Sequence, residues 1–123
     1  MILVDTSVWI DHLRAHDTVL ADLLGQGQVA SHPFVIGELA LGNLRQRARI
    51  LVDLQSLPQT AVATGAEILR FIEVHSLAGL GIGYVDAHLL AGALLTPGTS
   101  LWTRDKGLRA AAERRGLAAP RLR

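Results

Sequence analysis

The sequence predicts an α/β fold in which a central parallel sheet is flanked by helices. Three short apolar runs, at residues 2–5, 29–31 and 100–103, have the length and composition of buried strands. The segments between and after these runs carry apolar residues at helical spacing. Strands that alternate with helices favour a parallel sheet, because parallel neighbours must be joined by a crossover connection.

The first two helices follow from local signals. Thr6 or Ser7 is placed to cap a helix after the first strand, because a hydroxyl there accepts a hydrogen bond from a free amide of the first turn. A second helix covers 19–24 and ends at Gly25 and Gly27, since glycine readily closes a helix.

Proline, glycine and capping residues bound the remaining elements. Pro33 suits the first turn of a helix that stops near Gly42, and Thr64 with Glu67 predicts a capping box. Pro58 limits residues 57–61 to a loop or an edge strand. The other predicted elements are a helix at 44–54, apolar helical positions from Thr64 out to Leu77, a glycine-rich loop at 79–83, a helix at 84–95, and a helix at 106–115.

The bulk composition predicts a single domain, residues 1–123, with its own apolar core, because half of the 123 residues are hydrophobic. The absence of cysteine excludes disulfides and thiolate metal sites. Asp5 and Asp11 interrupt the first apolar run, unlike a secretion signal, and no run reaches the roughly 20 apolar residues of a membrane span. We therefore expect a cytoplasmic protein without a membrane anchor.

The net charge of +1 conceals an uneven distribution. Residues 99–123 contain seven basic and two acidic residues, so the rest of the chain is acidic. Such a basic region suits a phosphate-bearing partner or an acidic protein, and it equally suits a solvated helix face.

Four carboxylates stand in apolar segments, where an acidic residue is costly unless it is paired or binds a metal. Asp5 ends the first strand and Asp105 follows the last one, so both are expected at the carboxyl ends of the strands, where ligands bind in such sheets. Glu38 and Asp86 are expected near the N-terminal turns of helices that face the same crevice.

Each of these acids also has an ordinary structural explanation. Asp5 and Asp105 are placed to cap the helices that follow them. Glu38 has two arginines of the 44–54 helix as candidate ion-pair partners, and Asp86 is placed to complement a helix dipole. Four such acids together, each within an apolar segment, nevertheless favour a shared function.

A cluster of carboxylates requires a cation between its members or a bound proton, because like charges repel. Oxygen ligands alone suit Mg²⁺ or Mn²⁺ rather than zinc. Such a site is typical of phosphoryl transfer, since the metal polarises the phosphate and supplies hydroxide near neutral pH.

The other chemistry-bearing residues indicate no competing site. The five histidines lack metal-ligand spacing and are expected in structural or surface roles. The sequence contains no phosphate-binding Walker loop, no dinucleotide-binding fingerprint and no nucleophile elbow.

Each of the four carboxylates lies in a distinctive block of sequence. The blocks are ILVDTSVWID at 2–11, VIGEL at 35–39, GYVDAHL at 83–89 and LWTRDKGL at 101–108. In residues and order they resemble PIN-domain ribonucleases, especially VapC-type toxins of toxin–antitoxin pairs. The resemblance covers nearly the whole chain and implies a PIN-like α/β fold with an acidic cleft.

The resemblance also implies site residues. It implies an acidic quartet that binds Mg²⁺ or Mn²⁺, formed by Asp5, Glu38, Asp86 and Asp105. Within the quartet, Asp5 and Asp86 match the metal ligands, and the other two match supporting residues that orient water or complete a second metal site. Thr103 matches a hydroxyl position near the cleft, with Thr6 and Ser7 beside it.

The partners implied by the resemblance are RNA, a second copy of the chain in a homodimer, and a small VapB-like antitoxin. The C-terminal segment of such an antitoxin enters the cleft, and an arginine of that segment engages the carboxylates.

The mechanism expected from these residues is endonucleolytic cleavage of single-stranded or looped RNA. Metal held by Asp5 and Asp86 would activate a water for in-line attack on a phosphodiester, and the other two acids would position that water. The candidates for steering the RNA backbone are Arg104, Lys106 and Arg109.

Two other functional classes remain open at the level of sequence. A phosphatase or phospho-acceptor domain also has an Asp after its first strand, but Ser7 stands where a phosphoaspartyl phosphatase needs a second Asp. A non-catalytic interaction module would use the acidic cleft only to receive a basic partner segment. Titration with Mg²⁺ separates this module from a nuclease, because the module would show no carboxylate-dependent thermal shift.

Overall fold

Three parallel strands form the sheet of the computed structural model, which describes residues 1–120 of the chain. The strands are β1 (Ile2–Val4), β2 (Val29–Ala30) and β3 (Ser100–Trp102), in the order β2-β1-β3. Ile2 pairs with Val29 on one side and with Ser100 on the other. The backbone amide of Asp5 donates to the carbonyl of Trp102 at 2.9 Å, so the ends of β1 and β3 lie side by side.

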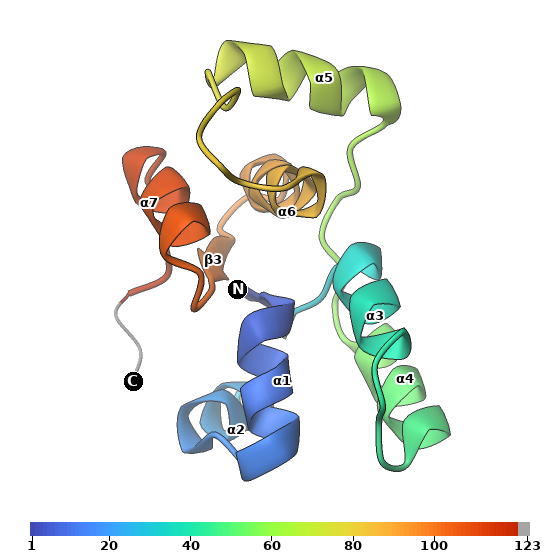
Figure 1. Cartoon of the computed structure of the whole chain (residues 1–123). Helices are drawn as coiled ribbons and strands as arrows, with labels where there is room; N and C mark the ends of the chain where they lie inside the picture. The colour runs from blue at the N-terminus through green and yellow to red at the C-terminus, as the bar shows by residue number, and fades with distance from the viewer. Residues whose placement is uncertain (121–123) are drawn as a thin grey trace.

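Helices surround this sheet, as the sequence predicts. Within residues 1–120 they are α1 (Thr6–Ala15), α2 (Thr18–Gly25), α3 (Pro33–Ala40), α4 (Arg47–Ser56), α5 (Gly65–Val74), α6 (Tyr84–Leu95) and α7 (Lys106–Arg114). Figure 1 shows α6 between α5 and β3, α7 beside β3, and α3 next to α4. The predicted α/β architecture, a parallel sheet flanked by helices, is confirmed.

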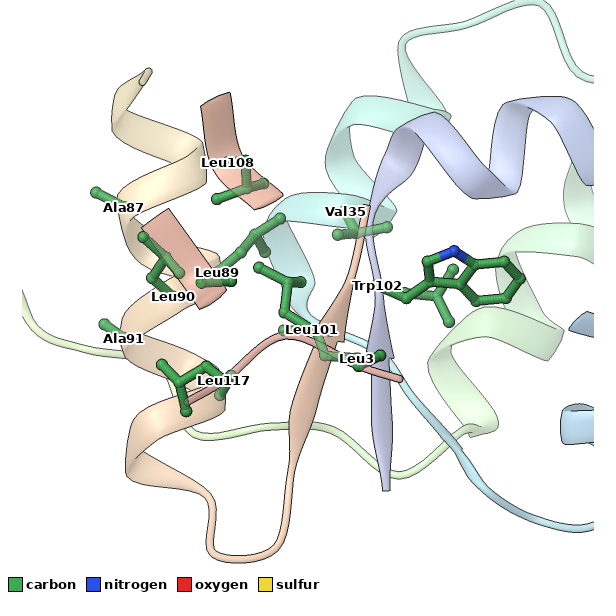
Figure 2. Packing of buried hydrophobic residues seen from close by; sticks show 14 of the residues in the cluster. Leu3, Val35, Ala87, Leu89, Leu90, Ala91, Leu101, Trp102, Leu108 and Leu117 are labelled. Carbon is green, nitrogen blue, oxygen red and sulfur yellow. The ribbon is translucent and has the colours of Figure 1, made fainter. Parts of the chain in front are cut away.

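The core lies on both faces of the sheet. Successive side chains of a strand point to opposite faces, and Figure 2 shows Leu101 directed toward α6 and Trp102 toward the other side. Leu89 and Leu90 of α6 are fully buried against this core. The sequence of α6 is apolar on nearly all sides rather than amphipathic, and the helix is accordingly buried along most of its length.

Of the three residues considered as caps of the first helix, Asp5 takes this role and Thr6 and Ser7 do not. Asp5 caps α1, because its side chain accepts a hydrogen bond from the amide of Thr6, whereas the hydroxyls of Thr6 and Ser7 are bonded to carboxylates. The capping box of α5 is confirmed, with reciprocal hydrogen bonds between Thr64 and Glu67 of 2.8 and 3.1 Å.

Two further helix boundaries differ from the sequence prediction. α4 begins at Arg47 rather than at residue 44, because Gln46 adopts a left-handed backbone conformation, with φ of 51°, where the chain turns back from α3. α5 ends at Val74 because Ser76 is left-handed and the amide of Leu77 donates back to the carbonyl of Ile72. This is a Schellman closure, so the apolar position at Leu77 lies beyond the helix.

Residues 57–61 run along the outer edge of β2, as expected of a loop or edge strand: Gln59 forms an isolated parallel bridge with Ser31. None of the helices within residues 1–120 has the length and apolar character that a bilayer crossing requires. Arg121 and Arg123, two of the basic residues counted in the C-terminal region, lie outside the described residues.

Candidate active site

Asp5 occupies the carboxyl end of the central strand and is almost fully buried, with 6% of its surface exposed. Its Oδ1 accepts a hydrogen bond from the amide of Thr6 at 2.8 Å. Its Oδ2 accepts from the Ser7 hydroxyl at 2.8 Å and from the Thr103 hydroxyl at 2.7 Å. Three donors therefore compensate the loss of hydration and fix the orientation of this carboxylate.

Thr103 connects Asp5 with Asp105, the acid that follows β3. The hydroxyl of Thr103 donates to Asp5 and accepts from the backbone amide of Asp105 at 3.0 Å. The side chain of Asp105 caps α7 through a 2.9 Å hydrogen bond from the amide of Leu108. The strand-to-helix junction thus orients both acids through one hydroxyl group.

Asp86 lies in the first turn of α6, where its Oδ2 accepts a hydrogen bond from the amide of Gly83 at 3.2 Å. Burial raises the pKa of the Asp86 carboxyl, and this outweighs the opposite effect of the Gly83 amide. The negative charges of Asp5, Asp105 and Glu38 raise the same pKa further. The charge of Asp86 is therefore coupled to the other three acids, although the four come from different segments of the chain.

Glu38 lies in the last turn of α3, not near the N-terminal turn as the sequence suggested. Its Oε1 accepts a 2.6 Å hydrogen bond from the Thr6 hydroxyl, which ties α3 to α1. The alternative ion pair of Glu38 with Arg45 or Arg49 does not form among the described residues, and Arg49 instead lies 3.8 Å from Asp53. The position arises because α3 runs away from the edge of the sheet, so its last turn reaches α1.

The cluster lacks compensating positive charge: within residues 1–120, none of the four carboxylates forms an ion pair with a basic side chain. In the same part of the chain, no three potential ligand side chains lie closely enough to enclose a metal ion. Mg²⁺ commonly takes one or two carboxylates directly and keeps several waters. The chemistry of this open, all-oxygen and uncompensated donor set fits such a divalent cation.

The three basic residues considered for RNA binding have different surroundings. Arg104 forms ion pairs with Asp11 and Asp17, and Arg109 lies 3.7 Å from Glu113 one turn along α7. Lys106 is exposed at the start of α7. The connections of Arg104 were missed by sequence reasoning, because Asp11 and Asp17 lie about 90 positions away in the chain and no local pattern joins them.

Three of the histidines have the structural roles expected of them. Nδ1 of the buried His32 accepts a hydrogen bond from the amide of Phe34 at 2.9 Å and caps α3. Burial lowers the pKa of His32 to about 4, and the nearby His88 contributes in the same direction. His88 is buried against Phe34, and Nδ1 of His12 accepts from the amide of Asp17.

Comparison with known proteins relates the chain to one family. The model of the PIN domain matches residues 2–114, a range that contains all four carboxylates. The chain is 52% identical over 118 residues to two proteins named Ribonuclease VapC32 from Mycobacterium tuberculosis, of strains CDC 1551 / Oshkosh and ATCC 25618 / H37Rv. The aligned region covers 96% of this chain and 95% of each relative.

Proposed function

Because the chain belongs to the PIN-domain family, we propose that it is a metal-dependent endoribonuclease and the toxin of a VapBC-type toxin–antitoxin pair. Relatives that are 52% identical over nearly their whole length carry the name ribonuclease VapC32. VapC-type PIN ribonucleases depend on a divalent metal. The whole chain, residues 1–123, serves as one PIN domain.

The observation that carries the proposal is the hydrogen-bonded link from Asp5 through Thr103 to Asp105, with Glu38 held by the adjacent Thr6. Neither these three acids nor Asp86 has a basic partner among the described residues. A group of like charges around the buried Asp5 and the half-buried Asp86 loses stability unless a cation binds there. Oxygen ligands favour Mg²⁺ or Mn²⁺, and we propose one of these two as the cofactor.

In the proposed mechanism, Asp5 and Asp86 would hold the cation, and Glu38 and Asp105 would orient the attacking water. When bound, the cation would supply charge to polarise the scissile phosphate and hydroxide near neutral pH. The Thr103 hydroxyl keeps the Asp5 carboxylate turned toward the site by hydrogen bonding.

Two further hydroxyl groups orient the acids, and two basic side chains lie beside Asp105. Ser7 holds the second hydrogen bond to Oδ2 of Asp5, and Thr6 fixes Glu38. Lys106 and Arg109 flank the start of α7 next to Asp105 and attract the phosphate backbone of RNA, which makes binding sensitive to salt.

The proposed partners are RNA, a second copy of the chain and a VapB-like antitoxin in the cytoplasm. A group of carboxylates without a basic partner favours an antitoxin segment that brings an arginine, because the guanidinium forms paired hydrogen bonds with carboxylates. Such a segment would compete with the metal for the same oxygens.

Cleavage of total cellular RNA by purified, antitoxin-free protein tests the proposal. Discrete fragments that require Mg²⁺ or Mn²⁺ and disappear with EDTA are expected from the wild type, and none from Asp5→Asn or Asp86→Asn. Asp53→Asn is the matched control, because Asp53 is an exposed acid on α4 paired with Arg49. Folded wild-type protein that cleaves nothing with either metal would leave only a binding module.

A further inference from the structure

We propose that Arg104 is a positioning residue that fixes the junction between β3 and α7 against the corner between α1 and α2. This junction carries the groups that orient Asp5 and Asp105, so Arg104 acts on the metal site through the backbone and not by touching RNA. The inference rests on the proposed function, because it assigns Arg104 a task within that site.

The guanidinium of Arg104 is held by two acids from the α1–α2 corner. Its Nη2 lies 2.8 Å from Oδ2 of Asp17, and its Nε lies 2.6 Å from Oδ2 of Asp11. The guanidinium carbon also lies 5.6 Å from the ring centroid of Trp102, within range of a cation–π contact. Contacts on three sides leave the side chain little rotational freedom.

The main anchor, Asp17, is itself fixed. Its Oδ1 caps α2 through a 3.0 Å hydrogen bond from the amide of Leu20, and its own amide donates to Nδ1 of His12 at 2.9 Å. Partial burial acts to raise the pKa of Asp17, but the hydrogen bonds from Leu20 and Arg104 outweigh it and lower this pKa. The carboxylate therefore stays charged and offers Arg104 a rigid partner.

The backbone of Arg104 faces the candidate site while its side chain faces the anchor. Its amide donates to the Ser7 hydroxyl at 3.1 Å, and that hydroxyl donates to Oδ2 of Asp5 at 2.8 Å. The preceding residue, Thr103, bonds the same carboxylate oxygen, and the following residue is Asp105. Residues 103–105 thus set the positions of Asp5 and Asp105. The central residue of the three, Arg104, has its side chain bound to the α1–α2 corner.

The ion pairs of Arg104 are partly exposed, with 34% of its side chain accessible, so they are expected to add little to global stability. Their effect should instead appear in the site, because groups that orient metal ligands commonly change metal affinity by 10- to 100-fold. Loss of the anchor therefore predicts weaker metal binding with a nearly unchanged melting temperature. A residue that bound RNA directly would not change metal affinity in the absence of RNA.

Titration of RNA-free protein with Mn²⁺, followed by the electron paramagnetic resonance of the free ion, measures this effect. We expect the Kd for Mn²⁺ to rise about tenfold in Arg104→Gln. It should rise less in Arg104→Lys, which keeps the positive charge but loses the planar guanidinium that binds two carboxylates at once. Arg49→Gln is the matched control, since Arg49 forms an exposed ion pair on α4 far along the chain from these residues. Its Mn²⁺ affinity should equal that of the wild type.

The variant Asp17→Asn separates positioning from RNA contact. Asparagine caps helices as well as aspartate does, so α2 keeps its cap, while Arg104 keeps its charge, loses the ion pair with Asp17 and retains only the one with Asp11. A positioning role predicts that Asp17→Asn binds Mn²⁺ more weakly and has a lower kcat at a similar KM. It also predicts that the double variant Asp17→Asn/Arg104→Gln binds Mn²⁺ no more weakly than Arg104→Gln alone. Direct RNA contact predicts a higher KM and a smaller salt dependence for Arg104→Gln alone.

Circular dichroism and thermal unfolding of every variant show which of them are folded. If Arg104→Gln does not fold, the Mn²⁺ affinity of Asp17→Asn tests the positioning role instead. Wild-type Mn²⁺ affinity in the folded anchor variants, beside normal metal-dependent cleavage by the wild type, would overturn the inference and leave the proposed function standing. A wild-type protein that neither binds Mn²⁺ nor cleaves RNA would overturn both.

Discussion

Acidification should destabilise this protein, and buried His32 should make a large contribution to that effect. The side chain is fully buried, its Nδ1 accepts the capping hydrogen bond from the amide of Phe34, and its Nε2 has no partner among the described residues. Protonation would convert the capping acceptor into a donor directed at another donor, and it would place a charge in an apolar environment. The pKa of His32 in the folded state is therefore lower than in the unfolded chain.

The magnitude follows from the two pKa values. The pKa of His32 is about 4 in the folded chain and 6.5 in the unfolded chain, so the unfolded state binds more protons between these values. Stability is then fully present above about pH 6.5 and declines as the pH falls toward 4. A difference of about 2.5 pKa units corresponds to about 3 kcal/mol in all, of which about 2 kcal/mol is lost by pH 5.

Urea unfolding measured between pH 7.5 and 4.5, for the wild type and for His32→Asn, isolates this contribution. Asparagine is a good capping residue that does not titrate in this range. The variant should be less stable at pH 7.5, because the smaller side chain leaves a cavity, but its stability should fall less on acidification. Equal pH dependence in the two proteins would refute the assignment to His32. The metal is left out of these samples, so that titration of the carboxylates is the same in both.

Three further changes have defined effects on stability, which is measured on the metal-free protein. Gly92→Ala should lower the free energy of unfolding by about 1–3 kcal/mol, because the added Cβ would lie 3.0 Å from Oγ1 of Thr60; a rise in the urea midpoint, as helix propensity alone predicts, would contradict this close approach. Ser76→Gly should stabilise by about 0.5–1 kcal/mol, because Ser76 has a φ of 52° at the end of α5; an unchanged or lower midpoint would count against the Schellman closure. Asp86→Asn should raise the melting temperature while it abolishes RNA cleavage, since it removes one of four mutually repelling carboxylates; a melting temperature that falls would show that the charge is compensated.

Much of the candidate site could be predicted from the sequence because its acids interrupt apolar segments. Asp5 and Asp105 follow strands, and the parallel order of β1 and β3 brings their carboxyl ends together. Both acids also cap helices, as the ordinary structural explanation expects. Capping and site formation are compatible here, because each carboxylate has two oxygens and Asp105 uses only one of them for its cap.

The details that depended on long-range packing could not be predicted. The place of Glu38 in the last turn of α3 already followed from the predicted bounds of that helix, but its bond to Thr6 did not, because it joins residues 32 positions apart. Arg104 looked like an RNA-facing cation because the local sequence is basic, but its ion-pair partners belong to the α1–α2 corner. The start of α4 was set by a tight turn after α3 and not by apolar periodicity.

The central claim, that the four carboxylates form a metal centre, is tested most directly by anomalous diffraction from crystals grown with Mn²⁺. We expect a peak within about 2–2.5 Å of carboxylate oxygens of Asp5 and Asp86, with Glu38 and Asp105 reaching it through water. No peak at saturating Mn²⁺, or a peak only at other acids such as Asp11 and Asp17, would rule out a metal centre at these four residues.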